Sequence, residues 1–209
     1  MLLSAYYHVF HPGTDPAAPP LLLLHATGGN EHDLVPLGRS LSPGSALLSP
    51  RGNVSEHGAP RFFARLAEGV FDPAEITRRT HELADWLELA RAQYNLNAAR
   101  LLAVGFSNGA NVAATLLLLR PASFADAILL RPMVVLDQPA AAGSLAGRHV
   151  LIASGAADPI VPSDHPPHLA ALLRAGGADV TLHTGRAGHG LASSDLAAAQ
   201  SWLHSSPRR

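Results

Sequence analysis

The chain has 209 residues, of which 47% are hydrophobic and 15% are charged, with 18 glycines and 17 prolines. This composition predicts one globular domain, residues 1–209, with a single sizeable core and many loops. All 15 basic residues are arginine and 16 residues are acidic, so the net charge of −1 and the lack of a long basic run argue against nucleic acid as a partner. Because the chain contains no cysteine, thiol nucleophiles, disulfides and zinc–thiolate sites are excluded.

The N-terminal segment, residues 1–8, has no positive region and only a short apolar run, unlike a secretion signal. No stretch of the sequence approaches the length of apolar chain that crosses a bilayer. We therefore expect a cytoplasmic protein without a membrane span. The sequence does not specify the oligomeric state, and a homodimer is one of the states it allows.

The first half of the chain alternates short apolar runs with polar segments. Strands are expected at residues 6–10 and 21–24, and the second of these is a run of four leucines. Such a run without alternation is typical of a parallel strand covered on both faces. A short helix over 33–41 and a strand over 46–49 follow. Residues 51–69 show no clear period and are expected to form a folded excursion on the surface.

The second half predicts longer helices. Asp72-Pro73-Ala74-Glu75 is typical of a helix start, and apolar residues at helical spacing follow it. Further strands are expected at 100–106, 128–130, 150–153 and 180–183. Further helices are expected at 108–119, which is apolar nearly all round, from Pro166 to the Gly176-Gly177 pair, and from a cap at Ser193 or Ser194. This alternation predicts an α/β fold with a mostly parallel, doubly wound sheet and right-handed crossovers.

A GxSxG motif joins the strand at 100–106 to the helix at 108–119, with Ser107 at its centre. In a strand–turn–helix of this kind the serine sits on a sharp, strained turn with its hydroxyl exposed. Gly105 and Gly109 suit that turn, because side chains at these positions would collide with neighbouring backbone. The motif therefore nominates Ser107 as a nucleophile.

A serine nucleophile needs a base to accept its proton and an acid to orient that base. Asp158 follows one predicted strand and His189, between two glycines, follows the last. The order Ser107, Asp158, His189 is that of an α/β-hydrolase triad, and the carboxyl ends of parallel strands gather ligand-binding residues. We predict Ser107 as nucleophile, Asp158 as orienting acid and His189 as base. Taken singly, Asp158 is also typical of a turn before proline and His189 of a surface loop.

Acyl transfer also needs two donors for the oxyanion of the tetrahedral intermediate. The candidates are the backbone amides of Thr27 and Asn108, with Gly28-Gly29 allowing the loop to turn its amides inward. The alternative is that these glycines only make a flexible turn. His25, on the same loop, is expected to have a structural hydrogen-bonding role.

Six segments together resemble the phospholipase/carboxylesterase family of small α/β-hydrolases. They are His25-Ala26-Thr27-Gly28-Gly29, Arg51-Gly52-Asn53, Arg61-Phe62-Phe63, Gly105-Phe106-Ser107-Asn108-Gly109-Ala110-Asn111, Asp158-Pro159-Ile160-Val161-Pro162 and Gly188-His189. Within that family the chain is most similar to the bacterial carboxylesterase branch associated with hydroquinone or catechol resistance, which is related to acyl-protein thioesterases. The resemblance runs from about residue 21 to the end. It implies the α/β-hydrolase fold, the same triad and the same oxyanion donors.

One residue departs from the family pattern, since Ala26 stands where HGxGG has glycine. A Cβ there would restrict the loop if a positive φ were required.

The leading functional hypothesis is an esterase that cleaves small-molecule esters with short or medium acyl groups through an acyl-enzyme. The chain is too short for a large cap domain, so an open or lightly covered pocket is expected. Its apolar wall is predicted from Phe62, Phe63, Ile160 and Leu191, although ordinary packing explains the two phenylalanines equally well. Arg51 and Arg61 are expected to anchor the surface excursion to carboxylates or carbonyls, and the alternative is that they bind an anionic substrate.

Two other functions fit the same residues. A thioesterase or lysophospholipase would differ only in the leaving group and the chain length of its substrate. A non-catalytic protein with a hydrolase fold would bind a small ligand without turning it over. No cofactor is expected, and no metal, because the histidines do not form HExxH or comparable ligand spacing.

Overall fold

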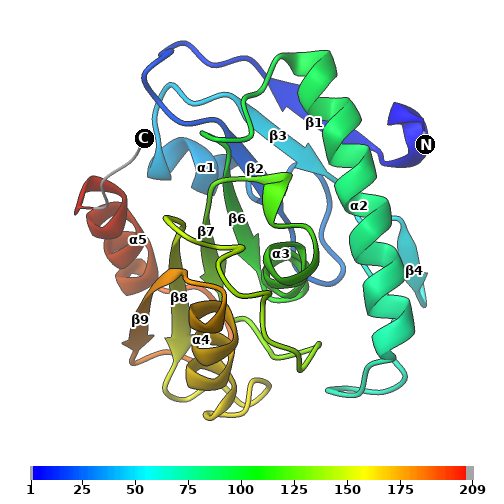
Figure 1. Ribbon diagram of the computed structural model, residues 1–209, viewed down its shortest axis with the longest axis vertical. Helices are drawn as coiled ribbons and strands as arrows, with labels where there is room; N and C mark the ends of the chain where they lie inside the picture. The colour runs from blue at the N-terminus through cyan, green and yellow to red at the C-terminus, as the bar shows by residue number, and fades with distance from the viewer. Residues whose placement is uncertain (1, 206–209) are drawn as a thin grey trace.

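The computed structural model describes residues 2–205 and shows a central sheet flanked by helices (Figure 1). Seven strands of this part of the chain form the sheet, in the order β1-β3-β2-β6-β7-β8-β9. Their bounds are β1 His8–His11, β2 Leu21–Leu24, β3 Leu47–Pro50, β6 Leu102–Phe106, β7 Asp126–Leu130, β8 His149–Gly155 and β9 Asp179–Gly185. All neighbouring pairs are parallel except β1 with β3. The predicted α/β-hydrolase fold with a mostly parallel sheet is therefore confirmed.

Helices cover both faces of the sheet, as Figure 1 shows. Their bounds are α1 Val35–Leu41, α2 Pro73–Tyr94, α3 Asn108–Leu119, α4 His165–Ala175 and α5 Ser193–Ser205, with 3₁₀ turns at Leu3–Ala5 and Pro121–Ser123. Alternate residues of one strand belong to two separate cores. Leu22 and Leu24 belong to the core that includes residues of α2, α3 and α4, whereas Leu21 and Leu23 belong to the core that includes residues of α1 and α5. A strand covered on both faces has no polar side to present, which explains the unbroken leucine run.

The ends of the long helix show how the sequence sets its limits. Asp72 caps α2 by accepting a hydrogen bond from the Ala74 N–H at 2.9 Å, and Pro73 occupies the first turn. At the other end Asn95 adopts a left-handed conformation with φ 53°. Both are standard start and stop devices. The helix α3 is buried from residue 108 to residue 118, as its apolar sequence predicts.

The excursion at 51–69 contains an element that the sequence did not reveal, a small antiparallel hairpin. Its strands are β4 Val54–Glu56 and β5 Ala59–Arg61, and residues 57 and 58 between them both have positive φ. Three-residue strands are too short to show a period of two, so no pattern distinguishes them from loop. Within residues 2–205, no helix combines the length and the apolarity needed to cross a membrane.

Candidate active site

Ser107 lies directly after β6, the central strand of the sheet, on the turn into α3. Its φ of 52° and ψ of −115° are rare for a residue with a side chain and cost about 1–3 kcal/mol. Two backbone hydrogen bonds hold this conformation, from the Ser107 N–H to Leu130 O and from the Asn111 N–H to Ser107 O, each 2.9 Å long. The strained turn predicted for the GxSxG motif is therefore present.

The two glycines of the motif are required because neighbouring backbone atoms leave no room for a Cβ at either position. A Cβ on Gly109 would lie 1.9 Å from Leu24 O, and a Cβ on Gly105 would lie 2.5 Å from Gly109 O. Real Cβ atoms do not approach backbone so closely, so any side chain would push α3 away from β2 and β6. This close packing brings the serine turn against the carboxyl end of β2.

The three predicted triad residues form one chain of hydrogen bonds. His189 Nε2 lies 2.9 Å from Ser107 Oγ, and His189 Nδ1 lies 2.9 Å from Asp158 Oδ2. Strand register explains their meeting, because β8 and β9 pair at Gly155 and Gly185, after which the Asp158 turn and the His189 loop begin. The ring of Phe106 packs against the His189 ring, with centroids 5.6 Å apart. The imidazole is thereby placed between a hydroxyl and a carboxylate.

The Asp158 carboxylate is held in one orientation by its own turn. Its side chain is only 2% exposed. Oδ1 accepts hydrogen bonds from the Ile160 N–H at 2.8 Å and the Val161 N–H at 3.1 Å, which leaves Oδ2 for His189. Burial raises the pKa of Asp158, but the hydrogen bonds from Ile160, His189 and Val161 outweigh it, so the pKa lies below the usual value. The carboxylate is therefore ionised at neutral pH and accepts a hydrogen bond from the Nδ1–H of His189.

The candidate oxyanion donors follow two neighbouring strands at the same offset. Leu24 of β2 pairs with Gly105 of β6, and Thr27 and Asn108 each come three residues later. Neither backbone N–H has a hydrogen-bond partner among residues 2–205, so both are free to donate. Asn108 is also the first residue of α3, where the positive end of the helix dipole favours negative charge.

The loop that bears Thr27 accommodates the departure at Ala26. In the described part of the chain Ala26 is not among the residues with positive φ, and the left-handed residue of this loop is Gly28, with φ 78°. A Cβ at position 26 therefore introduces no conformational strain.

The hairpin β4–β5 and the residue after it contact both oxyanion candidates. The Gly28 N–H donates to Pro60 O at 2.9 Å, Arg61 Nη1 donates to Thr27 Oγ1 at 2.6 Å, and the Phe62 N–H donates to Asn108 Oδ1 at 2.8 Å. The guanidinium of Arg61 is 3% exposed and also donates to Phe63 O. Arg61 is thus an anchor between the hairpin and the loop, as expected. Arg51 is likewise paired, with Glu31.

His25 is a structural residue at the base of the same loop. It is 1% exposed, its Nδ1 donates to Ala26 O at 2.6 Å, and its Nε2 accepts from the Gly52 N–H at 2.9 Å. Burial lowers its pKa, more than the hydrogen bond to Ala26 raises it, which favours the neutral ring. Only the neutral ring can accept the hydrogen bond from the Gly52 N–H at Nε2.

The four residues predicted as a substrate wall do not line one cavity. Phe62 and Phe63 lie in the core at 1% and 0% exposure, whereas Ile160 and Leu191 are 41% and 40% exposed. Ile160 lines a cavity of about 540 Å³ beside the Asp158 turn, and Leu191 lines a small space between α1 and α5. Their role in binding substrate stays a prediction.

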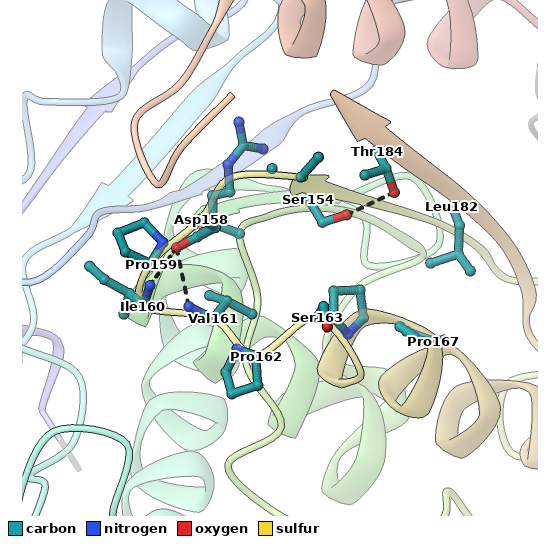
Figure 2. Close-up of a pocket in the computed structure, with 14 residues that line it drawn as sticks. Ser154, Asp158, Pro159, Ile160, Val161, Pro162, Ser163, Pro167, Leu182 and Thr184 are labelled. Atoms are coloured by element: carbon teal, nitrogen blue, oxygen red, sulfur yellow. Dashed lines mark hydrogen bonds between the residues drawn. The ribbon is translucent and has the colours of Figure 1, made fainter. Parts of the chain in front are cut away.

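Figure 2 shows the larger cavity, with Asp158 at its edge and the Ser154 and Thr184 hydroxyls in contact at 3.1 Å. Asp158 lines this cavity, whereas Ser107 and His189 do not. Among residues 2–205, no group of three or more His, Asp or Glu side chains is arranged as metal ligands.

One pair of residues beside the predicted triad has no counterpart in the sequence analysis. Arg131 follows β7 and forms a buried ion pair with Asp195 in the first turn of α5, at 2.7 Å. The sequence signal was an arginine and a proline directly after a buried strand, which alone does not distinguish a site residue from a turn.

Known proteins resemble this chain over more than nine tenths of its length. The Bacillus subtilis (strain 168) protein MhqD, which is named as a hydrolase, is 42% identical over 198 residues, covering 93% of this chain and 96% of that protein. The crystal structure of the Bacillus cereus carboxylesterase is 42% identical, with a TM-score of 0.92 over 97% of this chain and 95% of that one.

A carboxylesterase from Mesorhizobium loti is 34% identical, with a TM-score of 0.89 over 96% of this chain and 95% of that one. A scan against models of protein families found no match. Relatives at this level of identity and coverage nevertheless determine the family. The chain belongs to the phospholipase/carboxylesterase family of small α/β-hydrolases.

Proposed function

We propose that the protein is a serine carboxylesterase that hydrolyses small carboxylic esters through an acyl-enzyme. The observation that supports this most directly is the chain of two 2.9 Å hydrogen bonds from Ser107 through His189 to Asp158. The carboxylesterases among its relatives support the reaction class. A cytoplasmic location and a homodimer stay predictions from the sequence.

In the first half of the reaction Ser107 Oγ attacks the ester carbonyl carbon while its proton passes to His189 Nε2. The ionised Asp158 accepts a hydrogen bond from the Nδ1–H and stabilises the imidazolium. The carbonyl oxygen becomes an oxyanion, which the Thr27 and Asn108 amides stabilise by hydrogen bonds. The carbon–oxygen bond to the alcohol then breaks, and the imidazolium protonates the leaving alkoxide. The product of this half is an ester of Ser107.

In the second half water replaces the alcohol. His189 Nε2 takes a proton from the water as its oxygen attacks the acyl carbon, and the same two amides stabilise the second oxyanion. The bond to Ser107 Oγ breaks, Oγ regains a proton from the imidazolium, and a carboxylic acid leaves. Every atom that these reaction steps require is supplied by the substrate, by water or by the five named groups of the protein.

The test is Ser107→Ala assayed with p-nitrophenyl acetate and with a fluorophosphonate probe. We expect turnover to fall by roughly 10⁶-fold and covalent labelling to be lost, with the protein still folded. Ser201→Ala, on an exposed position of α5, is the matched control and should keep both. Turnover in Ser107→Ala would reject the proposal, and wild-type protein that does not label would favour a non-catalytic binder.

A separate experiment determines which leaving group and which acyl length the enzyme prefers. A series of p-nitrophenyl esters and matching acyl-CoA thioesters, from two to sixteen carbons, should give the highest kcat/KM with short or medium esters. Preference for long thioesters would instead assign a thioesterase.

A further inference from the structure

Arg131 lies at the carboxyl end of β7, between the strands that lead to Ser107 and Asp158. Phe106 and Leu130 are paired residues, so Ser107 and Arg131 are the next positions on adjacent strands. Like Ser107, Arg131 has a positive φ, 55°, although it carries a side chain. Such a conformation costs about 1–3 kcal/mol and persists only where surrounding contacts fix it.

The buried guanidinium of Arg131 makes five hydrogen bonds, one for each of its N–H donors. Nε donates to Gly188 O at 2.9 Å, Nη1 to Ala153 O at 3.2 Å and to Asp195 Oδ1 at 3.0 Å, and Nη2 to Gly190 O at 3.2 Å and to Asp195 Oδ2 at 2.7 Å. The side chains of Arg131 and Asp195 are 0% and 2% exposed. Their geometry is therefore fixed by a fully satisfied network.

Two of these acceptors are the residues on either side of His189. In the described chain, the backbone of residues 186–191 is hydrogen-bonded to other segments only through three carbonyls, those of residues 187, 188 and 190. Ala187 O accepts from the Ala157 N–H, and Arg131 provides the other two bonds. Asp195 also accepts from the Ala192 N–H at 2.8 Å, which closes the loop at its far end.

Stability alone does not account for this arrangement. Burying two charges costs several kcal/mol, and well-packed apolar residues at such sites are often as stabilising as the ion pair. Apolar side chains would, however, leave the Gly188 and Gly190 carbonyls without donors and the glycine-flanked loop free to move. An error of about 1 Å in the position of a catalytic group can lower the rate about 100-fold.

We propose that Arg131, oriented by Asp195, is a positioning residue that holds the His189 loop so that the imidazole meets both Ser107 and Asp158. The inference rests on the proposed function, because it concerns the base of the proposed triad. Arg131 contacts carbonyl oxygens and a carboxylate, not the reacting atoms, so it acts through the loop.

The test compares kcat and KM of Arg131→Lys and Asp195→Asn with a matched control, Arg148→Lys. Arg148 also donates to two backbone carbonyls, those of Phe124 and Ala125, but it does so at the opposite ends of the strands. We expect kcat to fall about 10- to 100-fold in the first two variants, with KM within about twofold. The control should keep wild-type kcat at a similar loss of Tm.

A double variant separates positioning from stability. Arg131→Met with Asp195→Leu replaces the ion pair by apolar groups and is expected to fold, yet it provides no donor for the loop carbonyls. A folded double variant with low kcat, and slow fluorophosphonate labelling, would support the proposal. If Arg131→Lys, Asp195→Asn or the double variant is folded and keeps kcat within twofold of wild type, the positioning role is rejected. Ser107→Ala retaining turnover would reject the triad itself.

Discussion

Replacing Asp158 by Asn tests the acid of the proposed triad, and the structure determines how the new amide must lie. The Oδ1 position receives two backbone N–H donors, from Ile160 and Val161, so the amide NH₂ cannot occupy it without facing two other donors. The amide oxygen therefore takes that position and the NH₂ faces His189 Nδ1. An imidazole that accepts at Nδ1 has its proton on Nε2.

A ring protonated on Nε2 cannot take the Ser107 proton. The wrong tautomer lowers kcat roughly 10⁴-fold in the best-known serine triad, which corresponds to about 5.5 kcal/mol of transition-state stabilisation. We expect the same order of loss in Asp158→Asn. The fold should be retained, because both backbone bonds to position δ1 persist.

The assay is steady-state hydrolysis of p-nitrophenyl acetate, with Tm measured on the same samples. Asp137→Asn is the matched control, since Asp137 also forms a contact with a histidine, His168, at 2.7 Å, but in an exposed pair. It should change neither kcat nor KM by more than about twofold. An Asp158→Asn protein within tenfold of wild-type kcat would show that Asp158 does not fix the tautomer, and the assignment would fail.

Three further changes probe the frame of the site. Gly109→Ala should unfold the protein or lower its Tm sharply, because the added Cβ would lie 1.9 Å from a carbonyl oxygen of β2. A Tm within about 4 °C of the wild-type value would contradict the close packing, since 4 °C corresponds to roughly 2 kcal/mol for a chain of this size. Thr27→Val removes the acceptor of Arg61 Nη1 and should cost about 1–3 kcal/mol in urea unfolding, while the backbone donor and measurable activity remain. The lowered pKa of His25 means that the unfolded chain binds its proton more readily, so the free energy of unfolding should decrease as pH falls below about 6.5. His25→Gln should flatten that dependence and His32→Gln, at an exposed ring, should not.

The sequence predicts those parts of the fold that depend on local pattern. The strand predicted from the leucines at 21–24 begins at the first residue of β2, and the helix start predicted at Asp72-Pro73 agrees with the first residue of α2. The sequence places the first strand at 6–10, but the strand lies at His8–His11 and pairs antiparallel at the sheet edge. Its pairing depends on β3, a contact between segments about forty residues apart that no local pattern records.

The candidate site likewise has parts that the sequence predicts and parts that it does not. Ser107, Asp158 and His189 could be nominated because each follows a predicted strand, and strand order turns chain order into proximity. The hairpin contacts to Thr27 and Asn108 could not, because they involve backbone groups of an aperiodic segment. Backbone donors and acceptors are the same for almost every residue type, so the sequence does not specify which of them meet.

Arg131 marks the limit of motif reasoning, since it is defined by its acceptors. Four of its five hydrogen bonds go to residues that follow it in the chain by 57 to 64 positions. Two of these acceptors are glycine carbonyls. A motif names the residues that react, because the chemistry demands particular side chains. It does not name the residue that holds the His189 loop, because that residue takes no part in the reaction and is defined by the backbone carbonyls that it reaches. Supporting residues should therefore be sought among the buried charged side chains that form hydrogen bonds with the backbone on either side of a reacting residue.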